Sequence, residues 1–212
     1  MMRIHKTAFQ AIIVSALVVL AALVMTLLNL GMKFHYGAQA TMDYPSLFLT
    51  IILMVAVSFM FGWLRYSLAG GLTLAIAVLH DQLLSFALCA IVSPALKLSV
   101  YTPAFLLAGT AMTYCFTIPW LRAARKLVRT NAARDYTRQM AAQQALKQVK
   151  PLFLLTLTVA VLILLAFLVS GNLIMAGTLL PLVTGLIASV LSIRLITPSV
   201  WAAFTFRSRT RR

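Results

Sequence analysis

The chain has 212 residues, of which 62% are hydrophobic and 10% are charged, and its mean hydropathy is +0.99. A water-soluble fold of this length has too little interior to hide so many apolar side chains, so the composition excludes a soluble globular protein. The net charge of +15 does not indicate nucleic-acid binding, because the basic residues lie between apolar stretches and at both ends, with no basic-aromatic surface or reading motif.

Charge-free stretches predict six transmembrane helices in a single membrane domain, 1–212. About 20 apolar residues cross a bilayer, and the charge-free stretch from Pro151 to Ile193 is about twice that length. It should therefore form a helical hairpin that turns at Gly171 and Asn172. The predicted spans are about 8–30, 45–64, 68–93, 98–121, 151–170 and 173–194. We expect an all-α membrane protein.

Lysine and arginine are distributed unequally between the two predicted sides of the membrane. The segment 122–150 and the chain ends carry most of them, whereas the opposite side receives Lys33 and Lys97. The positive-inside rule therefore predicts that both termini are cytoplasmic. Arg194, at the end of the last span, should extend its side chain to the same cytoplasmic interface.

The basic segment 122–150 has two interpretations that the sequence leaves open. Its second half is rich in good helix formers, and Asn131 is a candidate N-cap. A basic helix there could lie against the anionic cytoplasmic leaflet or against a partner protein. Alternatively, the segment is a solvated loop that carries the charge expected on the cytoplasmic side.

Asp81 is one of three acidic residues in the chain and falls in the middle of the third predicted span. A carboxylate there costs at least about 2.5–3.5 kcal/mol, so it should face other helices rather than lipid. Burial disfavours the ionised form, which makes Asp81 a candidate proton carrier. The alternative is a hydrogen-bonded carboxyl group that fastens this span to its neighbours.

His80 precedes Asp81 in the same span. Neighbouring helical residues point about 100° apart, so the two side chains should not bind one ligand together. A metal ion would need further ligands, and no other span offers a histidine or a carboxylate, so no metal site is predicted. Cys89 and Cys115 lie in apolar stretches and should be small buried residues.

No nucleophile–base pair, phosphate-binding loop or cofactor motif is present in the sequence, so we expect neither an enzyme nor a bound cofactor. Hydroxyl groups on the later spans are possible partners of Asp81: Thr110, Thr113, Tyr114, Thr156, Thr158, Thr184, Ser189 and Ser192. Small side chains in the sixth predicted span should allow close helix packing: Gly177, Gly185, Ala188, Ser189 and Ser192.

The order of these features resembles SecF, the subunit that with SecD assists Sec-dependent protein export and belongs to the resistance-nodulation-division superfamily. The third span has Gly70-Gly71 and then the pair His80-Asp81, and an apolar stretch leads on to Leu98-Ser99-Val100, similar to the order in the family. The fourth span keeps the family's glycine as Gly109, and a basic stretch follows it. Ser170-Gly171 and the run 188–193 are similar to later family motifs. The resemblance covers roughly residues 46–204.

Three departures from the family pattern are visible. The segment 31–43 is far too short for the extracytoplasmic domain that SecF carries between its first two spans. The family's Asn-Asp in the fourth span corresponds to Thr113-Tyr114, and its arginine at the start of the fifth lies near Lys150 and Pro151. The resemblance links those positions to proton coupling, and a tyrosine does not readily load and release protons near pH 7.

The resemblance therefore implies a SecF-type half-transporter of six helices in the bacterial cytoplasmic membrane. Its partners would be a SecD-like subunit and the Sec translocon, and it would assist protein export without supplying the coupling groups itself. Two alternatives remain. The chain could be a non-transporting scaffold or assembly protein that uses 122–150 to hold a partner. It could also be a small solute transporter of the same superfamily, which would require a homodimer and a polar cavity.

Overall fold

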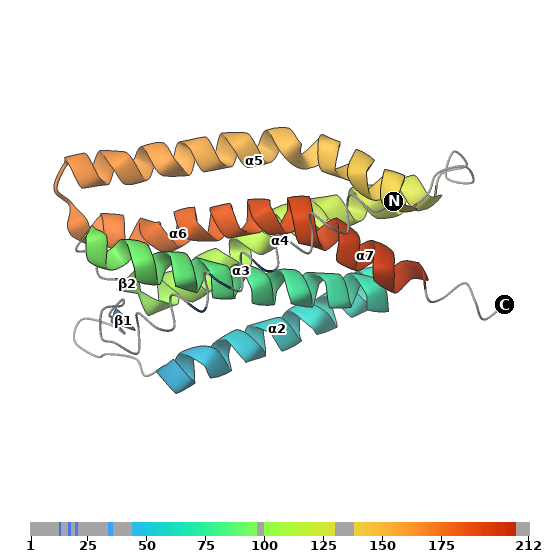
Figure 1. The fold of residues 1–212 in the computed structure, drawn as a ribbon, viewed down its shortest axis with the longest axis horizontal. Coiled ribbons are helices and arrows are strands. Elements are labelled where there is room, and N and C mark those ends of the chain that lie inside the picture. The colour runs from blue at the N-terminus through green and yellow to red at the C-terminus, as the bar shows by residue number, and fades with distance from the viewer. Residues whose placement is uncertain are drawn as a thin grey trace.

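The computed structural model describes residues 44–96, 100–129 and 138–206, together with 34–35 and three helical positions, Ile13, Leu17 and Leu20. Figure 1 shows long helices that run side by side along one axis. They are α2 (Tyr44–Tyr66), α3 (Leu68–Ala95), α4 (Thr102–Arg129), α5 (Arg138–Val169) and α6 (Leu173–Leu191). A π-helical turn, η2 (Ser192–Ile196), joins α6 to α7 (Thr197–Phe206) without a break.

Four helical stretches in the described part of the chain are long and apolar enough to cross a membrane: Phe48–Tyr66, Leu68–Ser93, Met140–Val169 and Leu173–Phe204. This supports a protein embedded in a membrane, but it does not confirm all six predicted spans. Apart from three positions, the predicted first span lies outside the described residues. The predicted fourth span is helical as part of α4, but threonines, a tyrosine and prolines interrupt its apolar sequence, and basic residues begin at Arg122.

Three helices extend beyond the ends that charge patterning predicts. α4 continues past 121 to Arg129, and α5 begins at Arg138 rather than near Pro151. The last helix continues past Arg194 through η2 and α7. Charge marks where a helix can leave lipid, whereas helix formers and packing partners decide where the helix itself ends. The segment 122–150 is thus helical at both of its ends, and Asn131 lies outside the described residues.

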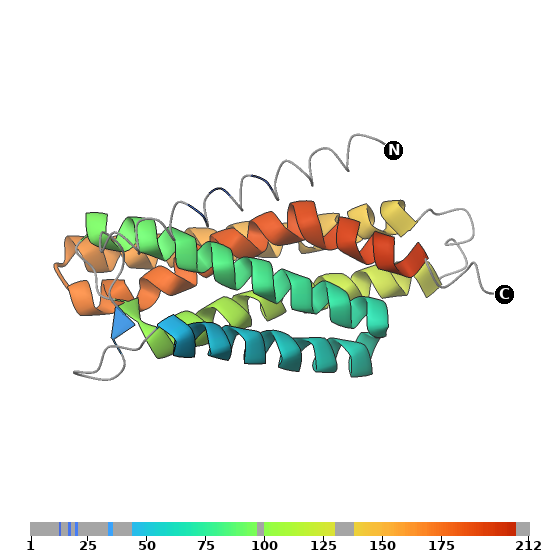
Figure 2. The same ribbon diagram turned by 60° about the horizontal axis from the view of Figure 1, so that its bottom comes forward.

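The central and outer helices differ strongly in burial. In the apolar windows of α3 and of Leu173–Phe204, 61% is buried inside the bundle, against 17% for the windows of α2 and α5. Figure 2 shows α3 and the α6–α7 helix crossing the middle of the bundle. The outward faces of α2 and α5 carry large exposed apolar residues, among them Leu53, Leu64, Leu155 and Val169. Such faces suit contact with lipid or with another membrane helix.

Two glycines allow α2 and α3 to pack closely near the turn that joins them. A Cβ atom on Gly62 would lie 2.8 Å from the Gly71 Cα, and one on Gly71 would lie 2.8 Å from the Phe59 carbonyl oxygen. Neither distance is possible for a real side chain, so both positions require glycine. Ser67 makes the turn itself with a φ of 122°, a backbone conformation that favours glycine.

Trp120 joins the extended ends of α4, α5 and α7. Its side chain is fully buried, and its indole Nε1–H donates to the Ala142 carbonyl oxygen at 3.1 Å. Its ring meets Trp201 of α7 edge-on, with the ring centroids 5.8 Å apart. Ala141 and Ala145 are buried on the same face of α5. The start of α5 is therefore packed against α4, rather than being a solvated loop.

Basic side chains gather where α4 ends. Arg122 donates to the Tyr66 hydroxyl at 3.2 Å, and Arg125 donates to the Arg65 carbonyl oxygen at 2.9 Å. These bonds join the end of α4 to the α2–α3 turn. The end of α4, the start of α5 and α7 all lie at this end of the bundle in Figure 1. The described basic residues near the end of α4 and the α2–α3 turn, namely Arg65, Arg122, Arg125 and Lys126, thus lie at one end of the bundle.

A short parallel pair of strands lies at the opposite end of the bundle (Figure 1). β1 (Phe34–His35) pairs with β2 (Val100–Tyr101), with Phe34 opposite Val100 and His35 opposite Tyr101. The sequence did not predict these strands, because two residues are too few to show an alternating pattern.

Candidate functional site

Asp81 lies within the bundle, halfway along α3, and its side chain is fully buried. It is the one acidic residue among those that the structure describes. α3 is a central helix with neighbours on most sides, which is why this position can be shielded from lipid. Burying a carboxyl group without partners would lower the stability of the fold, so the hydrogen bonds that Asp81 makes decide whether the site is stable.

Two hydroxyl groups from other helices bind the same oxygen of Asp81. Thr113 Oγ1 of α4 donates to Asp81 Oδ2 at 2.7 Å, and Ser189 Oγ of α6 donates to it at 2.9 Å. The two hydroxyl oxygens are themselves 3.4 Å apart. Residues from α3, α4 and α6 therefore meet at one carboxylate oxygen. We name this arrangement, Asp81 with Thr113 and Ser189, the carboxylate triad.

His80 contacts the other carboxylate oxygen. Its Nδ1 lies 3.2 Å from Asp81 Oδ1, and its side chain is 15% exposed against 1% for Asp81. The two neighbouring side chains thus contact each other, a contact that the sequence did not indicate. The imidazole ring turns back toward its neighbour, and it is the less buried member of the pair. Both oxygens of the carboxyl group thus have a polar contact.

A second polar contact joins α3 to α6 one turn further along. Ser85 Oγ lies 2.9 Å from Thr184 Oγ1, and Cys89 Sγ lies 3.1 Å from the same hydroxyl oxygen. Asp81, Ser85 and Cys89 are spaced four residues apart, so they share one face of α3. That face is directed at α6 and carries the polar side chains between the two central helices. Ser85 was not among the residues that the sequence indicated.

Gln82 directs a third polar contact toward α4 and α2. Its Nε2 donates to Thr110 Oγ1 at 2.8 Å, and that hydroxyl in turn lies 3.1 Å from Met54 Sδ. Gly109 makes room for it, since a Cβ there would lie 2.8 Å from the Gln82 amide nitrogen and oxygen. The resemblance indicated Gly109, but the sequence analysis did not single out Gln82. The signal that could have identified Gln82 was its position beside Asp81 in an apolar span.

The positions that the family resemblance links to proton coupling do not join the carboxylate triad as a set. Thr113 binds Asp81, but the Tyr114 hydroxyl lies 2.8 Å from Ser58 Oγ of α2, and its ring stacks on Phe61. Lys150 and Pro151 are exposed on the outer helix α5. Tyr114 and α5 thus provide no charged partner for Asp81 inside the described bundle.

The remaining predicted residues have packing roles. Gly185 and Ala188 are buried in α6, as helix-packing residues should be. Ser189 is buried as well, but it also donates to Asp81. Ser192 is buried at the start of η2, where its hydroxyl lies 3.4 Å from that of Thr197.

The two cysteines differ from each other. Cys89 is buried, whereas Cys115 is exposed on α4, so the prediction that both are buried is wrong for Cys115. Within the described ranges, no group of three or more histidine, cysteine, aspartate or glutamate side chains could hold a metal ion. The chemistry of the site is therefore that of a carboxyl group surrounded by hydroxyl groups and one imidazole.

Comparisons with known proteins identify no relative of the chain. No family model, no curated protein and no solved structure matches the chain. The resemblance to SecF therefore rests on the residues quoted above alone.

Proposed function

We propose that this protein is a SecF-like accessory subunit that assists protein export across the bacterial cytoplasmic membrane together with a SecD-like partner. One observation carries the proposal. The matched motifs of the third and the last span each contribute one residue to the carboxylate triad, Asp81 and Ser189. Thr113 completes it from a position where the chain departs from the family pattern. Asp81 belongs to the His-Asp motif, Thr113 to the position of Asn-Asp, and Ser189 to the last motif.

In this proposal the carboxylate triad is structural and the coupling groups belong to the partner. Thr113 and Ser189 both donate to Asp81, so the carboxyl group fastens α4 and α6 to α3. Tyr114 is turned toward Ser58, and Lys150 is exposed, so neither can exchange a proton with Asp81 by direct contact. The exposed apolar faces of α2 and α5 offer room for a second membrane subunit.

The test compares export and assembly in cells that carry an affinity-tagged chain. A SecD-like protein should co-purify with it, and deletion of the chain should slow the export of a Sec-dependent reporter protein. Asp81→Asn, which keeps the volume and a hydrogen-bonding group, should lower the amount of folded complex and export in proportion. If Asp81→Asn abolishes export while complex assembly is intact, the structural role is wrong. If deletion leaves export unchanged and no SecD-like protein co-purifies, the proposed function is wrong.

A scaffold is the second candidate, and one observation favours it. The first turns of α5 are packed on α4 through alanines, which leaves a polar face of Gln144, Lys147 and Gln148 exposed at the basic end. Removing this segment would also unpack Trp120, so surface substitutions are the better test. Gln144→Glu with Lys147→Glu should abolish partner binding if the helix is a docking site, and should leave the unfolding midpoint unchanged.

A further inference from the structure

The apolar surface of α5 ends abruptly at a lysine. Lys150 is exposed, and the leucines that follow it on the same helix are exposed as well: Leu152 at 46%, Leu154 at 58% and Leu155 at 66%. Lys147 is exposed one turn earlier and shares a face with Lys150. A change from lysine to lipid-facing leucine over one turn is typical of the boundary between headgroups and acyl chains.

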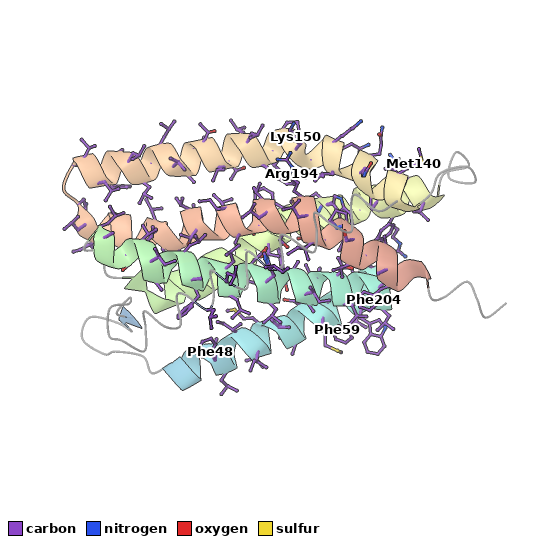
Figure 3. The ribbon with its side chains drawn as sticks, viewed as in Figure 1. Phe48, Phe59, Met140, Lys150, Arg194 and Phe204 are labelled. Carbon is purple, nitrogen blue, oxygen red and sulfur yellow. The ribbon has the colours of Figure 1, made fainter. Side chains whose placement is uncertain are left out.

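Arg194 has the same kind of position on the neighbouring helix. It is exposed in η2, while Ile193 and Ile196 on either side of it are buried. Leu191, one turn before it, is 41% exposed. Figure 3 shows Lys150 and Arg194 at the same level along the bundle, on α5 and on the helix that α5 packs against. The surface of α5 therefore changes from basic to apolar at the height of Arg194, whereas the last helix continues beyond Arg194 as the apolar α7.

No acidic side chain in the described ranges neutralises these charges. The single described acid, Asp81, is buried and is bound by Thr113 and Ser189. The ion pair found among the described residues joins Asp81 to His80, and it involves neither Lys150 nor Arg194. Among the described residues, the two basic groups thus border exposed leucines without an acidic partner, and an anion at the membrane surface would complement them.

We propose that Lys150 and Arg194 together hold the phosphate headgroup of an anionic phospholipid. Its acyl chains lie along the exposed leucines of α5 and along Leu191, and Lys147 adds a further positive charge. A guanidinium group binds phosphate oxygens in a fixed geometry, and a lysine contributes a mobile charge beside it. We favour a lipid over a soluble anion because exposed apolar surface that could contact its acyl chains begins within one turn of both cations.

The experiment uses the full-length protein purified in detergent, with bound lipid counted by native mass spectrometry. Phosphatidylglycerol should be retained more strongly than phosphatidylcholine. Lys150→Gln with Arg194→Gln should weaken phosphatidylglycerol retention by at least about tenfold, because each basic group near the surface contributes several-fold to binding. Arg65→Gln with Lys126→Gln is the matched control. It removes the same charge from exposed positions at the basic end on α2 and α4, and it should retain the lipid.

Each remaining outcome decides against the proposal. If the two double variants lose phosphatidylglycerol retention equally, the lipid is attracted diffusely to the basic end and is not held at Lys150 and Arg194. Equal retention of phosphatidylcholine means that charge is irrelevant. A thermal shift with inorganic phosphate as large as that with phosphatidylglycerol means that the site takes a soluble anion. If the glutamine pair does not fold, the salt dependence of wild-type binding decides, because retention unchanged between low and high salt overturns the proposal.

Discussion

Ser189 of α6 donates a hydrogen bond of 2.9 Å to Asp81 of α3, although the two residues are 108 positions apart in the chain. Thr113 of α4 donates to the same carboxylate oxygen at 2.7 Å. Breaking either bond would leave a buried polar atom with one partner fewer, which costs more than losing a bond at a solvent-exposed site. The position of the last helix relative to the third should therefore depend on these few atoms.

Ser189→Ala should lower the free energy of unfolding by roughly 1–3 kcal/mol, the cost of leaving a buried polar acceptor with one donor fewer. Unfolding of the purified protein in mixed detergent micelles measures it. Thr178→Ala is the control on the same helix, because the Thr178 hydroxyl donates to the Ile174 carbonyl oxygen within α6. That change should stay within about 0.5 kcal/mol. Combining Ser189→Ala with Thr113→Val should give a non-additive loss, since both hydroxyl groups bind one oxygen.

Gly71→Ala should destabilise the protein more than Gly109→Ala does. A Cβ on Gly71 would lie 2.8 Å from backbone atoms of Phe59 and Trp63, which cannot move without shifting α2. Overpacking of this kind costs roughly 1–3 kcal/mol. A Cβ on Gly109 would meet the end of the Gln82 side chain, which can move but then loses its bond to Thr110, at about 1 kcal/mol. The same unfolding measurement ranks the two variants by their loss of stability. A larger loss for Gly109→Ala would contradict the close contact of Gly71 with the backbone of α2.

Trp120→Phe should destabilise the packing of α4 with α5 and α7. The change removes the indole N–H that donates to Ala142 and reduces the ring contact with Trp201. We expect a loss of about 1–3 kcal/mol in the free energy of unfolding, from the lost bond and the unfilled volume. Trp63→Phe is the matched control, because Trp63 is 48% exposed on α2, and it should have little effect. Similar losses in both variants would mean that Trp120 is not a packing centre.

Ser67→Gly should raise the free energy of unfolding by up to about 1 kcal/mol, because the φ of 122° at this turn is one that glycine adopts without strain. Ser67→Val should lower it. Ser199→Gly provides a control of opposite sign. Ser199 lies within α7, where glycine should cost roughly 0.5–1 kcal/mol. If Ser67→Gly lowers stability as Ser199→Gly does, the turn is not strained at Ser67.

The helical class and the hairpin turn at Gly171 and Asn172 could be predicted because both depend on local sequence. Charge-free length sets the class, and Asn172 ends the turn by accepting a hydrogen bond from the Met175 N–H. The continuation of α5 back to Arg138 could not be predicted from charge. It depends on how Ala141, Ala142 and Ala145 pack on Trp120, a contact between distant segments.

The candidate site was only partly predictable for a related reason. An aspartate in an apolar span indicates a buried polar site by itself, and hydroxyl groups on other spans are its natural partners. Which hydroxyl groups reach it depends on how each helix is rotated. Thr113 and Ser189 face Asp81, whereas the neighbouring Tyr114 faces Ser58. Near-uniform apolar helices give no clear signal of rotation, so Ser85 and Gln82 could not be distinguished from their neighbours in advance.

The π-helical turn at Ser192–Ile196 has a consequence for the tolerance of the chain to deletion. Such a turn holds one residue more than an α-helical turn, so the two flanking helices are out of phase by about 100°. Loss of a single residue there would let one regular helix form and would rotate Trp201 away from Trp120. The extra residue of the π-helical turn thus fixes which side of α7 faces the bundle relative to α6.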